Sequence, residues 1–201
     1  MLGLAAAALA LQSAPAEGTG GDGREQRAKA RTVAVHSHFA EPSLSPDGLD
    51  CRPSSAEKSV EEVCKLHLIG PSTFTGTIHA KAALDYLAWP SGTKLKYTGT
   101  VLVRGSVAGC GVGSFVMDYP SGIVDQDEFD PATQSYPGRN PWVFRKGSGT
   151  GQLARLVSGS GMFTFRVYPL RGHDESDTFA EGDITGTLTC LAPHEPRARS
   201  H

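Results

Sequence analysis

The residues of this chain best suited to hold a ligand are aromatic side chains at alternating positions. Alternate residues of a β-strand face the same side, so strands around one interior would bring these rings together. Tyrosine and tryptophan add a polar tip that can orient a bound molecule. The sequence favours a dry, packed core around these rings, and the alternative is an apolar ligand site. The predicted lining residues are Tyr86, Tyr97, Phe115, Trp142, Phe144, Phe163 and Phe165.

The acidic, histidine and serine residues of the chain do not form a recognisable catalytic or metal-binding pattern. The acidic segment Asp125–Asp130 lacks the glycine and terminal glutamate of a calcium-binding loop, which favours a solvated hairpin tip. The seven histidines show no helical His-x-x-x-His pair, so no metal site is predicted. No serine-hydrolase elbow occurs, and catalytic residues cannot be assigned. The carboxylates to examine inside any cavity are those of Asp85 and Asp118.

A glycine motif at Gly149–Ala154 has the spacing of a dinucleotide-binding loop. That motif functions only where it opens a helix whose N-terminus meets the pyrophosphate. Here a second glycine cluster, Ser158–Gly161, follows too soon for such a helix. A phosphate-binding P-loop also lacks its Gly-Lys-Ser/Thr ending. We therefore expect no cofactor.

The beginning of the chain resembles an export signal. An apolar run over residues 2–11 is followed by Ser13-Ala-Pro-Ala16, a small-residue pattern typical of signal-peptidase cleavage, although no basic residue precedes the run. The run is too short to cross a bilayer, which takes about 20 apolar residues. We predict a signal peptide at 1–16, an extracellular protein and no membrane span. The alternative is an apolar extension of a cytosolic protein.

The four cysteines are consistent with export, because an even count without Cys-x-x-Cys spacing is typical of disulfides. Three connectivities are possible for four cysteines. We favour a local Cys51–Cys64 bridge and a long-range Cys110–Cys190 bridge. In the chain-entropy account the longer bridge would stabilise the fold by about 4–5 kcal/mol.

Composition divides the chain into four parts. Residues 17–50 are rich in Gly, Ala, Ser, Pro and charge and are predicted to be a disordered leader. Residues 51–191 are long enough for one core, and 192–201 form a polar tail. The net charge of −2 argues against nucleic-acid binding. The oligomeric state cannot be inferred.

Between residues 63 and 191 the dominant hydrophobic period is two, which is typical of antiparallel strands with one buried face. No segment is long enough for a crossover helix, which disfavours parallel βαβ folds. About eight strands are predicted, with a ninth run at the end. They are Val63–Ile69, Ser72–Lys81, Leu84–Ala88, Lys94–Val107, Gly113–Tyr119, Ile123–Glu128, Trp142–Lys146, Met162–Tyr168 and Thr178–Leu191.

Glycines at the starts of strands favour a closed barrel over a sandwich. Glycine permits the sharp bends and close backbone approaches of a curved sheet. Such clusters occur at Gly111–Gly113, Gly147–Gly151 and Gly159–Gly161. The fold predicted is an all-β, single antiparallel eight-stranded barrel, with a jelly-roll or immunoglobulin-like sandwich as the alternative.

Three of these segments carry a resemblance to a known group. Cys110–Phe115, Gly147–Gly161 and Gly186–Cys190 resemble the bacterial members of the allene-oxide-cyclase-like barrels, which include exported proteins of unknown function. The resemblance covers about residues 72–191 and rests on structural glycines. It implies an eight-stranded calycin-like barrel with a ligand pocket in its mouth. No residue matches the catalytic positions of the plant cyclases, so no catalytic residue is carried over.

Three functions remain open on the sequence. The first is an exported, disulfide-stabilised barrel without enzymatic activity that binds a small hydrophobic ligand. The second is a cyclase or isomerase without a redox cofactor, which works by folding a flexible substrate. The third is a structural or interaction module at the cell surface that uses loops such as Asp118–Asn140. An internal cavity of about 300 Å³ or more would favour the first two.

Overall fold

The computed structural model describes residues 29–43, 45–53, 62–169 and 178–192. This part of the chain is almost entirely β-structure, with one short 3₁₀ helix. The elements are β1 (Ala30–Glu41), β2 (Ser45–Pro53), β3 (Glu62–Gly76), β4 (Ile78–Ser91), β5 (Lys94–Val107), β6 (Gly111–Asp125), β7 (Tyr136–Phe144), η1 (Gly151–Arg155), β8 (Leu156–Val167) and β9 (Ala180–Leu191).

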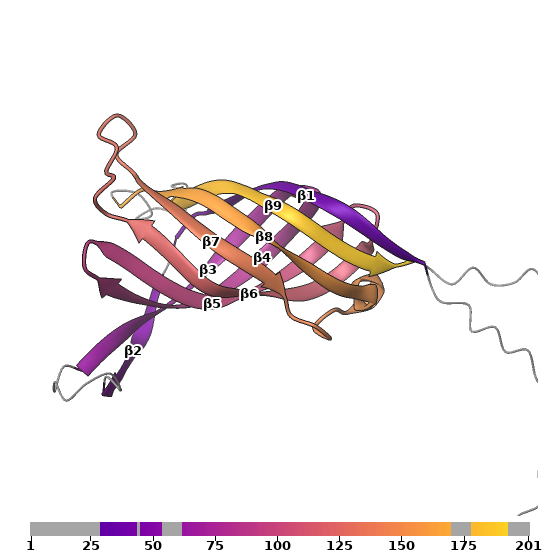
Figure 1. Ribbon diagram of the computed structural model, residues 1–201, viewed down its shortest axis with the longest axis horizontal. Helices are drawn as coiled ribbons and strands as arrows, with labels where there is room; N and C mark the ends of the chain where they lie inside the picture. Colours follow the sequence, from indigo (N-terminus) through magenta and orange to yellow (C-terminus); the bar gives the residue numbers. More distant parts are fainter. Residues whose placement is uncertain (1–28, 44, 54–61, 170–177, 193–201) are drawn as a thin grey trace, which may run out of the picture.

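The strands form a closed antiparallel barrel of eight strands, as the hydrophobic period predicts (Figure 1). Neighbours follow the order β1-β9-β8-β7-β6-β5-β4-β3, and β1 also pairs with β3 to close the circle. β1 pairs with β9 along its whole length, from Ala30 opposite Leu191 to Glu41 opposite Ala180. Closure leaves the barrel without a free edge between these strands.

The β1–β3 junction is short and is reinforced by side chains. Only four residue pairs join the strands, from Ser37 opposite Gly76 to Ala40 opposite Thr73. The buried Ser37 hydroxyl accepts a hydrogen bond from the Ile78 amide at 2.8 Å. The Ser72 hydroxyl donates to the Ala40 carbonyl at 3.2 Å. The Ser72 hydroxyl therefore extends the short β1–β3 ladder, and Ser37 joins β1 to the first residue of β4.

The predicted leader is wrong for residues 30–41, because these residues form β1. Its inward positions Val35, Ser37 and Phe39 are buried, while His36 and His38 are exposed. Small and polar residues interleaved with few apolar ones hide the period of two in this segment. β2 also begins within the expected leader, at Ser45, although it is not one of the barrel strands.

Two predicted boundaries between strands are also wrong. Residues 63–76 form a single strand, β3, that passes through Gly70-Pro71 without a break. Residues 111–125 likewise form one strand, β6, whose register against β5 shifts between Tyr97 and Gly99. Proline and glycine are compatible with a strand at such an irregularity, so they did not mark turns here.

One end of the barrel is filled by a packed core around Trp142. This side chain is fully buried, and its Nε1 donates a hydrogen bond to the Thr185 carbonyl at 3.1 Å. A Cβ built on Gly161 would lie 1.9 Å from that same carbonyl oxygen and 2.6 Å from Trp142 Nε1. The glycine cluster therefore allows β8 and β9 to approach around the indole, which the sequence pattern predicts.

The disulfide between Cys110 and Cys190 lies at this packed end and confirms that bridge. It joins the start of β6 to the end of β9 across 80 residues of chain, and both cysteines are buried. Cys51 and Cys64 are opposite each other in the β2–β3 register, but their side chains lie outside the described residues. The local bridge therefore stays a prediction.

The β2–β3 hairpin projects beyond the barrel as a two-stranded arm (Figure 1). β2 pairs with β3 alone, so the arm adds no strand to the closed circle. Among the residues that the structure describes, no helix has the length and hydrophobicity needed to cross a membrane.

We expect the Cys110→Ala/Cys190→Ala double variant to be less stable than wild type by about 4 kcal/mol. The cross-link closes a loop of 80 residues and so lowers the conformational entropy of the unfolded chain. Urea unfolding under non-reducing conditions measures this difference, with Cys51 and Cys64 intact in both proteins. An unchanged unfolding midpoint would contradict the expected role of the bridge.

Candidate functional site: the hollow end of the barrel

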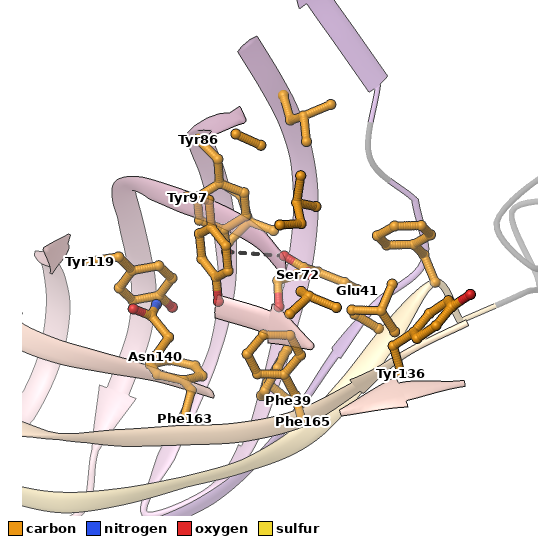
Figure 2. A pocket seen from close by; sticks show the side chains of 18 of the residues that line it. Phe39, Glu41, Ser72, Tyr86, Tyr97, Tyr119, Tyr136, Asn140, Phe163 and Phe165 are labelled. Atoms are coloured by element: carbon orange, nitrogen blue, oxygen red, sulfur yellow. Dashed lines mark hydrogen bonds between the residues drawn. The ribbon is translucent and has the colours of Figure 1, made fainter. Parts of the chain in front are cut away.

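The end of the barrel opposite the disulfide encloses a cavity of about 280 Å³. Its walls come from all eight barrel strands, and it reaches Gln126, Pro169 and Phe179 beside the connecting loops. The lining is largely aromatic and aliphatic. Its polar members include Glu41, Ser72, Asn140 and the hydroxyl groups of the tyrosines (Figure 2).

Four of the seven predicted ligand-site residues line this cavity, namely Tyr86, Tyr97, Phe163 and Phe165. The other three lie in the packed core at the opposite end, and they are Phe115, Trp142 and Phe144. An alternating pattern identifies inward positions but does not indicate the level of a residue along the barrel axis. Both predicted outcomes, a pocket and a packed core, therefore occur in one barrel.

Glu41 is the acidic residue of the cavity, and the sequence analysis missed it because it lies in the expected leader. It ends β1, is 5% exposed, and accepts a hydrogen bond from the Tyr86 hydroxyl at 3.2 Å. Burial raises the pKa of Glu41 to about 8, although the Tyr86 bond acts in the opposite direction. Its place in the alternating set Val35, Ser37, Phe39, Glu41 is the signal that could have found it.

Three tyrosines from adjacent strands surround this carboxyl group. Tyr86 of β4 lies with its ring centroid 5.4 Å from that of Tyr97 on β5 and 5.6 Å from that of Tyr119 on β6. Burial is the largest cause that raises the pKa of each of the three hydroxyls, and the charge of Glu41 adds to it. These hydroxyls therefore stay protonated and serve as neutral hydrogen-bonding groups.

Asn140 is the least satisfied polar residue of the site. Its side chain is 1% exposed, and neither Oδ1 nor Nδ2 has a hydrogen-bond partner among the described residues. It extends from β7 opposite Phe163 of β8, and Figure 2 places it on the Tyr119 side of the cavity. A buried amide without partners costs about 1–3 kcal/mol per group, so Asn140 leaves hydrogen-bonding capacity unused in the cavity wall.

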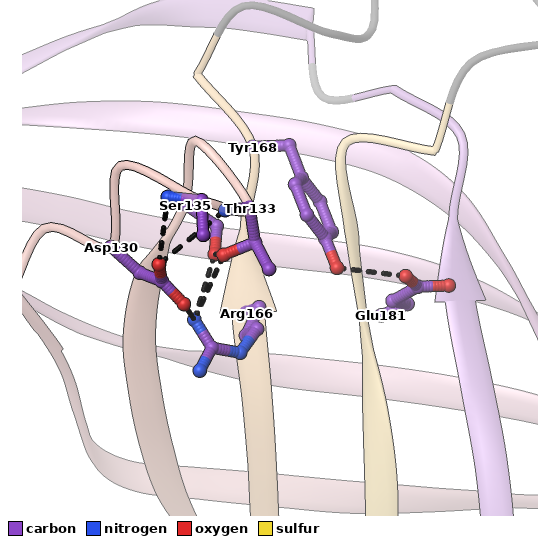
Figure 3. A network of polar contacts seen from close by, with 7 residues as sticks. Asp130, Thr133, Ser135, Arg166, Tyr168 and Glu181 are labelled. Carbon is purple, nitrogen blue, oxygen red and sulfur yellow. Dashed lines mark hydrogen bonds and ion pairs between the residues drawn. The ribbon is translucent and has the colours of Figure 1, made fainter.

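The rim beside β7 is fixed by a polar network around Arg166 (Figure 3). Its Nη1 donates to the Asp130 carboxylate at 3.1 Å, to Ser135 Oγ at 2.9 Å and to Thr133 Oγ1 at 3.2 Å. Nearby, the Tyr168 hydroxyl donates to Glu181 at 2.8 Å. The Arg166 contacts hold the loop between β6 and β7 in place at the mouth, and the Tyr168 contact joins the end of β8 to β9.

The other candidate acids make structural interactions outside the cavity. Asp118 accepts a hydrogen bond from Arg145 Nε at 3.1 Å. Asp125 pairs with Lys94 at 3.0 Å, and Asp127 accepts from Thr93. Asp85 is exposed and points away from the interior. No cluster of three or more potential metal ligands occurs in the described part of the chain.

The glycine motif at 149–154 has a structural role. It leads into the single-turn helix η1, whose Leu153 is buried in the core. A Cβ built on Gly149 would lie 2.1 Å from the Leu153 carbonyl oxygen, so the glycine permits this tight turn.

Comparison with known protein families and with curated proteins finds no match. A similar solved structure is that of a protein of unknown function from the DUF3224 family of Shewanella oneidensis MR-1, determined at 1.84 Å. The two chains are 20% identical; the alignment covers 81% of this chain and 100% of that chain, with a TM-score of 0.47.

We expect Glu41→Gln to stabilise the protein at pH 8 by about 4–5 kcal/mol and to change its stability little below pH 4.5. The folded protein keeps the Glu41 proton up to about pH 8, whereas the unfolded chain releases it near 4.5. Unfolding free energy therefore falls as pH rises between these values, and glutamine cannot titrate.

Urea unfolding at a series of pH values measures this effect. Glu128→Gln, which removes an exposed carboxylate outside the cavity lining, is the matched control and should keep the wild-type pH dependence. Equal slopes for wild type and Glu41→Gln between pH 5 and 8 would refute the buried, protonated state of Glu41.

Proposed function

We propose that this is an exported barrel protein that binds one small, mostly apolar molecule in its hollow end. The volume of about 280 Å³ is just below the usual range for ligand pockets, which begins near 300 Å³, and therefore suits only a small ligand. Ligand pockets are usually apolar with a few polar groups that fix orientation. The aromatic walls together with Glu41 and Asn140 have this composition.

The observation that carries the proposal is the unpartnered amide of Asn140. A residue selected for stability alone at this inward position would be apolar, as the flanking inward residues Gly138 and Trp142 are. A ligand with a hydroxyl, carbonyl or amide group would supply the missing hydrogen bonds. We therefore propose that the ligand has an apolar body and at least one neutral hydrogen-bonding group.

Export is supported by two independent features. The first is the signal-like segment at residues 1–16. The second is the Cys110–Cys190 disulfide, since such bonds persist mainly in oxidising compartments. Native mass spectrometry of the protein released by its own producer would show its mature N-terminus and any co-purified ligand. A mature chain that retains residues before Ala16, or that carries reduced thiols, would refute export.

A cyclase or isomerase without a redox cofactor is the second candidate. The position of Glu41 favours it, because a carboxyl group with a pKa of about 8 can exchange protons with a substrate near neutral pH. The proposed relation to the allene-oxide-cyclase-like barrels points the same way. Conversion of a recovered ligand to an isomer of the same mass by wild type, and not by Glu41→Gln, would distinguish enzyme from binder.

We expect Ala88→Leu to weaken binding of a neutral apolar probe, N-phenyl-1-naphthylamine, by at least tenfold. Ala88 is buried and lines the cavity, so the larger side chain occupies ligand volume. Fluorescence titration measures the affinity. Ala83→Leu, on the exposed face of the same strand, is the control and should bind as wild type does. Equal affinities for the two variants would place the probe outside this cavity.

We expect Asn140→Leu to stabilise the ligand-free protein by about 1–3 kcal/mol, because leucine has a similar volume and leaves no buried amide unpaired. The same variant should bind a hydroxyl-bearing probe such as 3-tert-butylphenol more weakly than wild type. Thermal unfolding and calorimetric titration measure the two effects. A variant less stable than wild type would show that the amide has a structural partner.

A further inference from the structure

The charge balance of the cavity is unusual. Glu41 is an acid buried among aromatic rings, and the described lining residues contain no lysine, arginine or histidine. A buried carboxylate is normally paired with a cation or a metal. Here its one hydrogen bond within the described structure comes from the neutral Tyr86 hydroxyl. Among the described residues, the cavity therefore holds an acid that can take a negative charge and has no cation beside it.

The walls around this carboxyl group are suited to a positive charge. Aromatic faces are electron-rich and attract ammonium groups placed within about 6 Å of a ring centroid. Tyr86, Tyr97 and Tyr119 all line the cavity, and Phe39 and Phe165 face them from β1 and β8. The Tyr97 and Phe165 centroids are 6.3 Å apart, and those of Phe39 and Phe165 are 6.1 Å apart. Differently inclined rings thus lie on several sides of the same space (Figure 2).

We infer that the ligand is a small organic cation, an amine or quaternary ammonium compound with an apolar body, whose charged group lies between Glu41 and the tyrosine rings. This inference rests on the proposed binding function and specifies its ligand class. The cation supplies the missing counter-charge, the rings bind its alkyl substituents, and Asn140 remains available for a polar group elsewhere on the molecule.

Binding of such a cation changes the protonation of the site. In the empty barrel Glu41 holds a proton, and a quaternary ammonium group displaces it, so one proton leaves for each cation bound. The titratable groups that face Glu41 are Tyr86 from β4, Tyr97 from β5 and Tyr119 from β6, and all three remain neutral across this range. Its neighbours on β3 and β9 are Ser72 and Ala180, which do not titrate.

A pair of isosteric probes tests the inference directly. We propose calorimetric titration of the full chain with 3-hydroxyphenyltrimethylammonium and with 3-tert-butylphenol, which differ in one atom, N⁺ against C. At pH 8 we expect the cation to bind at least tenfold more tightly. Its affinity should fall by up to about tenfold per pH unit between pH 8 and pH 6, as Glu41 becomes protonated.

Two variants distinguish attraction of the cation to Glu41 from its general attraction to an acidic protein. Glu41→Gln should lose both the preference for the cation and its pH dependence, and should still bind 3-tert-butylphenol. Glu128→Gln removes one exposed carboxylate outside the cavity lining and should behave as wild type with both probes at every pH.

The outcomes are distinguishable. Equal or tighter binding of 3-tert-butylphenol by wild type, or an unchanged cation preference in Glu41→Gln, would overturn the cationic ligand and leave the proposed apolar pocket intact. If neither probe binds, and the neutral naphthylamine does not bind either, the binding function itself would be overturned.

Discussion

Closure of the barrel by its first strand is the constraint on which the remaining structure depends. β1 pairs with β9 on one side and with β3 on the other, so a sheet that would otherwise have two edges has none between these strands. Because closure sets the curvature, it also sets the interior volume that side chains must fill. The same strand brings Phe39 and Glu41 into that interior. The same strand, β1, therefore closes the barrel and carries two residues of the candidate site.

The interior is divided between a solid half and a hollow half. Around Trp142, glycines remove side-chain volume from β8 and β9 and let the backbone approach the indole, while Leu153 of η1 fills the remaining space. At the other end no comparable plug is present among the described residues, and aromatic rings pack against the wall. Polar groups that would weaken a packed core, Glu41 and Asn140, are placed in this half. The packed core and the cavity with its buried polar groups thus lie at opposite ends of the barrel.

The fold was largely predictable and the site only in part. The period of two and the glycine clusters identified inward positions and closure, since both are local properties of strands. Tyr97 and Phe165 were found as lining residues because aromatic alternation is conspicuous, but Trp142 was assigned to the site although it lies in the solid half. Glu41 was missed because polar spacing made its strand resemble a leader. Asn140 lies two residues before Trp142 and so faces the same side of β7. A polar residue at an inward position beside a tryptophan was a sign of the site that the sequence analysis did not use.

The ladder between β1 and β3 is one of the shortest in the barrel. Four backbone pairs and the Ser72 hydroxyl join β1 to β3, compared with twelve pairs between β1 and β9. Parting of these two strands would open a lateral slit beside Phe39 and Phe74, both of which line the cavity. The long ladders and the Cys110–Cys190 cross-link would remain closed. Such a parting would connect the cavity to solvent through the barrel wall instead of the rim, and the packed end around Trp142 would stay in place.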